Sequence, residues 1–297
     1  MSAPNRAAWL RKRVDSFPYW HYRFDLGDGV VTPIFDPAHA VRHEERKRYF
    51  LKPAIDLLGG LEGRRVLDLG CNAGFWSLAA IEAGATYVLG IEGRAEQVEQ
   101  ARFVFEATGI DPVRYDFRRE NVFDFALARG EAPFDLVLCL GLLYHVNRPV
   151  ELFRLIERVN SDLLVVDTEL SLARGSMFQV KHESTDAPRH SVDDELIFHP
   201  TRDAVVELAR AFGYDVVALR PRFRSWVGST DFRTGRRLAF VCAKTTSLAS
   251  LEAAQQSALG GVLDAMTQRL PDPLRPGVTR LRVLGGRIRR RLRRLTD

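Results

Sequence analysis

The stretch VLDLGCNAGFWSLAAIEAGATYVLGIEGR, residues 66–94, decides the fold. Its first apolar run, Val66–Leu69, predicts a strand that meets Gly70 and then Gly74, after which the pattern becomes helical. Glycine has no side chain, so the backbone can turn sharply here and approach a ligand closely. Open α/β sheets bind ligands at the carboxyl ends of their strands. Asp68 is therefore expected to accept a hydrogen bond from the amino group of a ligand, directly or through water.

A second apolar run, Tyr87–Ile91, predicts the next strand and is followed by Glu92. A carboxylate at this position accepts hydrogen bonds from both hydroxyls of a ribose and would repel a ribose 2′-phosphate. The spacing Gly70-x-x-x-Gly74 lacks the G-x-G-x-x-G pattern that seats a pyrophosphate on a helix N-terminus. The stretch therefore predicts a site for one nucleoside with an amino-acid tail. A tight strand–helix turn without a ligand is the alternative.

Short apolar runs alternate with amphipathic helical stretches through most of the chain, which predicts an α/β fold with helices on both faces of a mostly parallel sheet. The polar residues 171–200 are expected to form an irregular insertion. Expected strands are Arg65–Leu69, Tyr87–Ile91, Val113–Phe117, Leu136–Leu140, Leu163–Thr168, Asp215–Leu219 and Leu238–Lys244. Expected helices are Arg42–Leu58, Gly74–Ala83, Ala95–Thr108, Pro149–Val159 and Thr201–Phe212.

The segments VLDLGCNAG (66–74) and GIEGR (90–94) resemble the first and second motifs of class I S-adenosylmethionine (SAM)-dependent methyltransferases. The resemblance implies a Rossmann-like fold with a seven-stranded sheet whose last strand is antiparallel. It also implies that Asn121 and Val122 flank the adenine and that Leu140 lines the sulfonium side. The cofactor-binding residues expected on this basis are Asp68, Gly70, Asn72, Gly74, Phe75, Glu92, Asn121, Val122 and Leu140.

Three further segments resemble the group that contains the tRNA wobble-uridine (carboxy)methyltransferases. They are FDLVLCLGLLYHVNRPVELFRLI (134–156), WHYRFDLGDGVVTP (20–33) and LIFHPTRDAVVELARAFGYDVV (196–217). The chain before the first motif is much shorter than in the wobble carboxymethyltransferases, and the basic residues that hold a carboxylated cofactor there have no evident counterpart here. Ordinary SAM is therefore the expected cofactor, and the fold alone does not fix the acceptor.

Composition and motifs together predict three parts of the chain. Residues 1–40 are expected to form an N-terminal flap or extension, and residues 41–245 a SAM-binding methyltransferase domain that contains the polar insertion 171–200. Residues 246–297 are expected to form a helical, arginine-rich C-terminal extension. No apolar run is long enough for a transmembrane helix and the N-terminus lacks a signal-peptide pattern, so a cytoplasmic protein is expected.

Charge is distributed unevenly along the chain. The net charge is +5, but residues 265–297 contain ten arginines and two aspartates, a net charge of +8, so the preceding residues carry −3. A mildly acidic body disfavours a large nucleic-acid-binding surface. The tail would suit an anionic membrane surface, RNA phosphates or an acidic partner, and a solvated tail without a partner is the alternative.

His145 is the leading candidate for a general base, because it follows the predicted fourth strand at the sheet edge where the methyl group should point. Imidazole suits this role, since its unperturbed pKa lies near working pH. Asp167 and Glu169 follow the fifth strand and share one face, where they would orient His145, bind acceptor hydroxyls or hold a divalent cation such as Mg²⁺. No compact ligand spacing supports a metal site. The non-catalytic alternatives are a helix-start histidine that only packs or hydrogen-bonds to the backbone, and a solvated strand end for the two carboxylates.

The insertion is dense in His, Asp and Glu, as expected for a lid over a sugar or polyol. His199 directly precedes Pro200 and is expected to be structural. The expected substrate-binding residues are Tyr22, Tyr144, His182, His190 and Trp226. These residues favour a SAM-dependent O-methyltransferase acting on a hydroxyl of a small metabolite, a sugar or glycoside. A tRNA wobble-uridine methyltransferase or carboxymethyltransferase is the alternative, and a non-catalytic SAM-binding protein is the second alternative.

Overall fold

The computed structural model describes residues 3–193 and 195–256. The chain divides into two compact units, Met1–Leu248 and Ala249–Asp297. In the second unit residues 249–256 are helical. The rest of the predicted arginine-rich extension, with its predicted contact to a membrane surface or another anionic partner, lies outside the described residues. Within the described part of the chain, no helix is both long and apolar enough to cross a bilayer.

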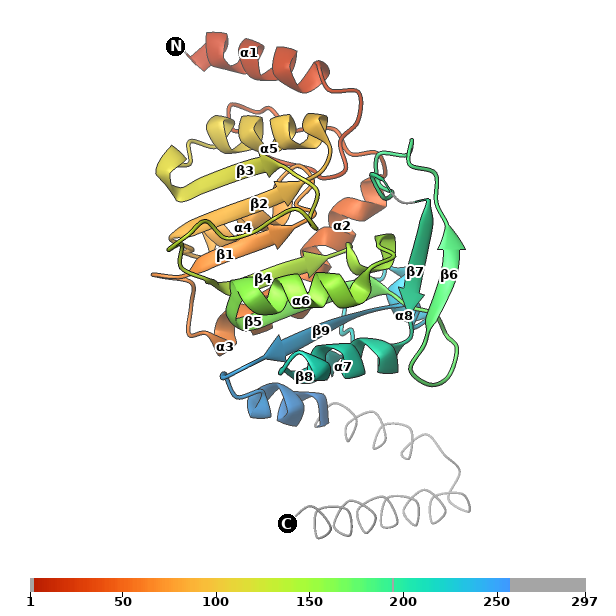
Figure 1. The fold of residues 1–297 in the computed structure, drawn as a ribbon. Coiled ribbons are helices and arrows are strands. Elements are labelled where there is room, and N and C mark those ends of the chain that lie inside the picture. Colours follow the sequence, from red (N-terminus) through yellow and green to blue (C-terminus); the bar gives the residue numbers. More distant parts are fainter. Residues whose placement is uncertain (1–2, 194, 257–297) are drawn as a thin grey trace, which may run out of the picture. The chain divides into compact units, whose positions relative to one another are not determined.

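The first unit is built on one seven-stranded sheet (Figure 1). Its strands are β1 (Arg65–Leu69), β2 (Tyr87–Glu92), β3 (Tyr115–Arg119), β4 (Phe134–Leu140), β5 (Asn160–Glu169), β8 (Asp215–Leu219) and β9 (Arg237–Ala243). The strand order is β3-β2-β1-β4-β5-β9-β8. Pairing is parallel from β3 to β5, and β9 runs antiparallel to both β5 and β8. This topology confirms the predicted mostly parallel sheet with an antiparallel last strand.

Helices cover both faces of the sheet, as predicted. Figure 1 shows α6 (Pro149–Val159) and α7 (Arg202–Ala211) in front of the sheet and α2 (Pro37–Arg46) and α3 (Lys52–Leu57) behind it. The π-helical segment η1 (Lys47–Leu51) joins α2 to α3. The other helical elements are α1 (Ala3–Asp15), α4 (Phe75–Glu82), α5 (Ala95–Ala107), η2 (Pro112–Arg114), η3 (Leu143–His145) and α8 (Thr230–Arg233).

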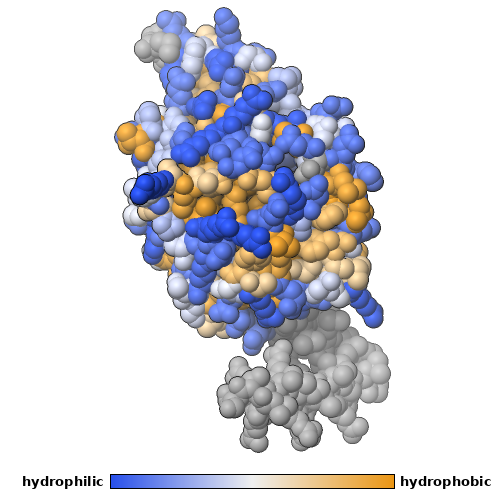
Figure 2. Space-filling model, in the orientation of Figure 1, coloured by the Kyte–Doolittle hydropathy of each residue, from blue (hydrophilic) through white to orange (hydrophobic). Residues whose placement is uncertain are grey.

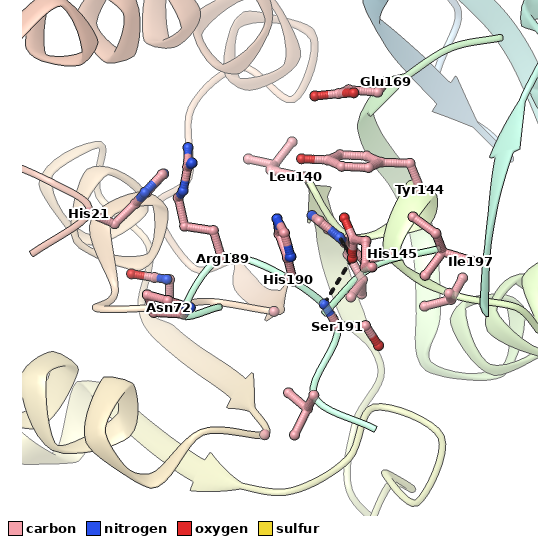
Figure 3. A pocket seen from close by; sticks show the side chains of 18 of the residues that line it. His21, Asn72, Leu140, Tyr144, His145, Glu169, Arg189, His190, Ser191 and Ile197 are labelled. Atoms are coloured by element: carbon pink, nitrogen blue, oxygen red, sulfur yellow. Dashed lines mark hydrogen bonds and ion pairs between the residues drawn. The ribbon is translucent and has the colours of Figure 1, made fainter. Parts of the chain in front are cut away.

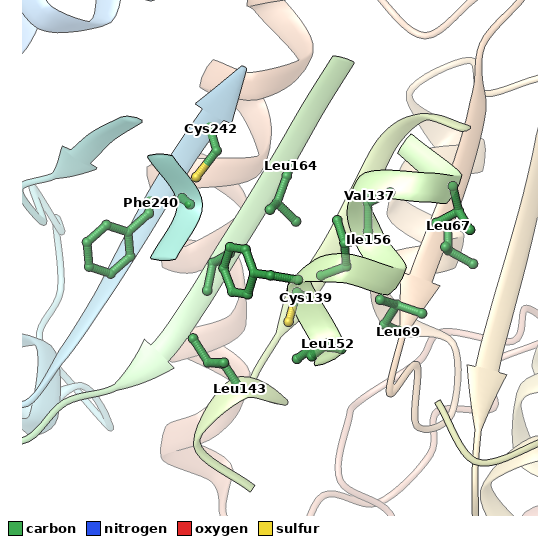
Figure 4. Close-up of a cluster of buried hydrophobic side chains, with 14 of the residues drawn as sticks. Leu67, Leu69, Val137, Cys139, Leu143, Leu152, Ile156, Leu164, Phe240 and Cys242 are labelled. Atoms are coloured by element: carbon green, nitrogen blue, oxygen red, sulfur yellow. The ribbon is translucent and has the colours of Figure 1, made fainter. Parts of the chain in front are cut away.

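The front core lies between the sheet and α6 (Figure 4). Leu152, Ile156 and Val159 recur at helical spacing along α6 and are buried against β1, β4 and β5. Full burial of one such side chain stabilises the fold by about 1.5–3 kcal/mol. This packing holds in place the strand ends on which the site is built.

Gly74 makes the turn from β1 into α4. Its φ is +78°, in the left-handed region, and a Cβ atom there would lie 3.2 Å from Ala101 Cβ and from Phe117 Cζ. Any side chain would therefore push α5 and β3 away from the turn. Gly70 also has a positive φ of +69°. The two glycines of the motif are thus explained by backbone conformation, which favours glycine over all other residues.

The prediction that residues 171–200 are irregular is wrong in part. These residues contain an antiparallel hairpin, formed by β6 (Phe178–His182) and β7 (Leu196–Pro200). One face of this hairpin is apolar and exposed, with Val180 56% and Leu196 39% accessible. Figure 2 shows this apolar surface at the right-hand edge of the molecule. The opposite face turns Lys181 and His199 toward a cavity. The buried Ile197 lies on the same face as these polar residues, so the two faces of the hairpin are not divided into one apolar and one polar side.

Two other expectations need correction. The third strand begins at Tyr115 rather than Val113, because Asp111 caps the short turn η2 and leaves Val113 78% exposed. The N-terminal segment also contains α1, which was not predicted. Its aromatic cluster is part of the core, since Trp20 and Tyr22 are only 2% and 5% exposed.

Candidate functional site

A cavity of about 760 Å³ opens at the carboxyl ends of β1, β2, β4 and β5. Residues 183–193 follow β6 and lead toward β7, and we call them the cover loop. The cover loop forms much of one wall of the cavity. Figure 3 shows His21 and Arg189 on one side, Tyr144 and Glu169 on the other, and His145 and His190 between them. All seven histidines of the chain line this cavity: His21, His39, His43, His145, His182, His190 and His199.

Glu92, at the end of β2, is the carboxylate expected to bind a ribose. Its Oε2 accepts the backbone N–H of Asn72 at 3.0 Å, and its Oε1 accepts the backbone N–H of Arg94 at 3.0 Å. Burial raises the pKa of Glu92, and these two N–H donors oppose the effect. A carboxylate has about four lone-pair sites. Each oxygen of Glu92 can therefore accept one more hydrogen bond, so the carboxylate can bind the two hydroxyls of a ribose.

Most of the predicted cofactor residues line the cavity, namely Gly70, Asn72, Glu92, Asn121, Val122 and Leu140. The other three lie behind its wall. Asp68 is buried and accepts a 2.7 Å hydrogen bond from Ser77 Oγ. Burial raises the pKa of Asp68 to about 7. Gly74 makes the turn, and Phe75 stacks on Tyr22 with ring centroids 4.6 Å apart. These three residues shape the site from below rather than forming its surface.

His145 lies in η3, directly after β4, and lines the cavity. Its Nδ1 lies 2.6 Å from Glu183 Oε2, and both side chains are 12% exposed (Figure 3). Burial alone would raise the pKa of Glu183, but the hydrogen bond and charge of His145, the backbone N–H of Ser191 and the charge of His190 together lower it. With Nδ1 donating to this carboxylate, Nε2 is the nitrogen left to accept a proton.

Glu183 was missed by the sequence analysis. It is the first residue of the cover loop, and its partner His145 lies 38 positions earlier in the sequence. The density of acidic residues in the insertion indicated a polar cover, but nothing in the pattern selected one carboxylate.

Asp167 is placed differently from the expectation. It is fully buried behind the cavity wall, where it pairs with Arg46 and accepts Arg237 Nε at 3.0 Å. Burial alone would raise the pKa of Asp167, but the two arginines lower it. The expected contact of Asp167 with His145 or an acceptor is therefore not present, because its charge is already matched by two cations. Glu169 does line the cavity, 3.6 Å from Arg237 Nη1.

Four of the predicted substrate residues line the cavity, namely Tyr22, Tyr144, His182 and His190. Trp226 does not, because it packs on Phe223 with ring centroids 5.1 Å apart. His199 is 4% exposed, and burial, with Lys181 nearby, lowers its pKa to about 4. Burial likewise lowers the pKa of His21 and His43, so these imidazoles are neutral.

His39, His43 and the helix that carries them, α2, were not foreseen as part of the site. His39 and His43 lie one turn apart on α2, and Arg42 and Arg46 accompany them at the wall. Helical spacing alone predicts that these residues share one face of a helix. It does not predict that this face lies opposite the strand ends. Among the residues that the structure describes, no three His, Cys, Asp or Glu side chains are arranged to hold a metal ion.

Known proteins resemble this chain at the level of the domain. Residues 61–190 match the family model described as a methyltransferase domain. Ubiquinone biosynthesis O-methyltransferase of Actinobacillus pleuropneumoniae serotype 5b is 37% identical over 98 residues, which are 32% of this chain and 40% of the relative. The enzyme of the same name from Bordetella avium is 33% identical over 120 residues, or 40% and 46% of the two chains. The chain thus spans less than half the length of these curated relatives.

Among solved structures, the N-terminal domain of EvdMO1, crystallised in the presence of SAH and D-fucose, has a TM-score of 0.58 at 23% identity. The match covers 82% of this chain and 96% of that domain, and it supports the fold. Residues 61–190 therefore match a methyltransferase domain, and the described residues have the Rossmann-like methyltransferase fold that the motifs predict. The closer resemblance to tRNA wobble-uridine enzymes is not shown by these relatives and stays a prediction.

Proposed function

We propose that this chain is a SAM-dependent O-methyltransferase that acts on a hydroxyl of a small acceptor, a sugar or glycoside. The observation that carries the proposal is the 2.6 Å contact between His145 and Glu183 in the same cavity as Glu92. A histidine oriented by a carboxylate is suited to remove a proton from a hydroxyl. The carboxylate of Glu92 is suited to hold the nucleoside that accompanies the reaction.

The proposed cofactor site consists of residues that already line the cavity. Glu92 would hold the ribose, Asn121 and Val122 the adenine, and Gly70 and Leu140 the end that carries sulfur. When bound, SAM supplies a methyl group on a positively charged sulfur. The N-terminal domain of EvdMO1 was crystallised in the presence of SAH, which supports this choice of cofactor.

His145 is proposed as the general base. Nδ1 donates to Glu183, so that Nε2 can take the proton from the acceptor hydroxyl as its oxygen becomes a nucleophile. The negative charge of Glu183 stabilises the imidazolium that forms. Because both side chains are 12% exposed, their interaction is screened less than one in bulk water.

Polar side chains around His145 support a hydroxylated acceptor. His182, His190, Lys181 and Glu169 line the wall and offer both donors and acceptors of hydrogen bonds. The names of the curated relatives contain O-methyltransferase, and the description of the EvdMO1 domain includes D-fucose. The names of the relatives agree with methyl transfer to oxygen, and the presence of D-fucose agrees with a sugar as the acceptor.

The direct test is transfer of labelled methyl from SAM to a panel of sugars and glycosides, phenols and unmodified tRNA. The proposal predicts label in a sugar or glycoside, at a hydroxyl identified by mass spectrometry. Label in tRNA alone would favour the wobble-base alternative. SAH binding without transfer to any member of a broad panel would favour a non-catalytic SAM-binding protein.

A further inference from the structure

Arg94 follows Glu92 by two residues and directly precedes α5, without a capping hydrogen bond from its side chain. Its side chain leaves the sheet edge and reaches the cover loop. One terminal nitrogen, Nη2, lies 2.8–3.4 Å from four backbone carbonyl oxygens of that loop. They belong to Thr185, Ala187, His190 and Ser191. A positive charge is thus placed where the negative ends of four carbonyl dipoles converge, which strengthens these contacts.

Three further contacts tie the cover loop to the same side of the sheet. Gln97 Nε2, on α5, donates to the carbonyl of Pro188 at 2.7 Å. Asn121 Nδ2 donates to Asp193 Oδ2 at 2.6 Å. The loop also packs directly on the main chain after β2, since a Cβ atom on Gly93 would lie 2.9 Å from Val192 Cγ2. Arg94 is the centre of this attachment, because it reaches four positions along the loop.

Arg94 is also joined to the proposed ribose site. Its backbone N–H donates to Glu92 Oε1 at 3.0 Å. Glu92, Arg94 and the loop residues His190 and Ser191 all line the cavity. A nucleoside held by Glu92 would therefore lie between the sheet edge and the cover loop, beside the residue that connects them.

The cover loop is joined to the proposed base as well. Glu183 Oε2 accepts the backbone N–H of Ser191 at 3.1 Å and also contacts His145 Nδ1 at 2.6 Å. The position of Ser191 therefore constrains Glu183, and Glu183 constrains the imidazole. Arg94 Nη2 lies 3.2 Å from the carbonyl of Ser191, so the arginine is one residue away from the carboxylate that orients the base.

We propose that Arg94 is a positioning residue that holds the cover loop over the nucleoside and, through Ser191 and Glu183, fixes the orientation of His145. This inference rests on the proposed function, because it assigns Arg94 a role in the same reaction. It has two consequences. Release of the cofactor product requires the Arg94 contacts to break, and loss of those contacts weakens both product retention and proton removal.

Variants of Arg94 separate this role from simple packing. Arg94→Ala removes all four contacts, and Arg94→Lys keeps the charge but lacks the planar fork of the guanidinium. Arg102→Ala is the matched control, because Arg102 also lies on α5 and donates to one backbone carbonyl, that of Phe117. The measurements are amide hydrogen exchange in residues 184–193, the dissociation rate of SAH, and kcat and KM for methyl transfer.

For Arg94→Ala we expect about tenfold faster exchange in the cover loop and about tenfold faster SAH release, with Arg94→Lys intermediate. A fall in kcat at saturating SAM should accompany these changes, whereas Arg102→Ala should leave all three unchanged. Unchanged exchange in Arg94→Ala, or unchanged kcat despite faster exchange, would overturn the inference. If the wild-type chain does not bind SAH, the proposed function fails instead, and exchange still tests the attachment of the loop.

Discussion

Two carboxylates near the cavity have opposite surroundings. Asp167, at the end of β5, is enclosed by Arg46 and Arg237, whereas Glu183, in the cover loop, contacts His145 at the cavity surface. The first carboxylate is neutralised by cations that are always charged, and the second is paired with a group that gains and loses a proton. A position at a strand end is therefore not enough to make a carboxylate functional; the charges around it decide.

The largest effect is expected from Asp167. Asp167→Asn leaves the buried Arg46 without its counter-charge and Arg237 with only Glu169, so the free energy of unfolding should fall by about 3–5 kcal/mol. Thermal and denaturant unfolding would measure this. The control is Asp56→Asn, because Asp56 pairs with Lys52 at the surface with both side chains more than half exposed, and such pairs contribute little. If both substitutions lowered the free energy of unfolding by the same small amount, the proposed difference between the buried Asp167 and an exposed carboxylate would be wrong.

Glu183→Gln should affect turnover rather than stability. The amide keeps the size of the side chain and one acceptor oxygen, but it loses the charge that stabilises an imidazolium. We expect kcat to fall about 10- to 100-fold, since a hydrogen bond to a charged partner contributes about 1.5–3 kcal/mol. Glu195→Gln, at an exposed carboxylate after the cover loop, is the matched control. An unchanged kcat in Glu183→Gln would show that the carboxylate is structural, like Asp167.

Glu92, like Glu183 and unlike Asp167, lines the cavity. In Glu92→Gln the amide nitrogen cannot accept a hydrogen bond, so one ribose hydroxyl or one backbone N–H loses its partner. SAH affinity should fall about tenfold or more, as measured by calorimetry. Adenosine should lose affinity by the same factor, because the lost contact is to the ribose. An effect on SAH alone would instead assign Glu92 to the amino-acid end.

Asp68, behind the wall, is expected to give an effect that is seen only as a pH dependence of stability. Its pKa is raised from 3.8 to about 7 in the folded protein, chiefly by burial. Between these values the folded state binds the proton and the unfolded state does not, so this group lowers stability as pH rises, by at most about 1.4 kcal/mol per pH unit. Asp68→Asn cannot ionise and should gain stability relative to wild type across this window. Parallel pH curves for the two proteins would contradict the shift.

Sequence patterns predicted the sheet, and six of the nine residues predicted for the cofactor site line the cavity, because both predictions depend on local features. The apolar runs, Gly70, Gly74 and Glu92 lie within one continuous stretch, and neighbouring parallel strands bring their ends to one edge. The base side depends on contacts between distant segments. The pairing of His145 with Glu183, the cations around Asp167 and the attachment of Arg94 to the cover loop join residues 38 to 121 positions apart. No local pattern encodes such contacts.

The central claim is that one cavity holds a nucleoside through Glu92 and a base at His145. Measuring both SAH affinity and methyl transfer in His145→Gln tests it most directly. The account predicts a fall in kcat of about 10²- to 10⁴-fold, typical for loss of a general base, with unchanged SAH affinity. Full turnover in this variant, or a loss of SAH binding that accounts for the lost turnover, would contradict it.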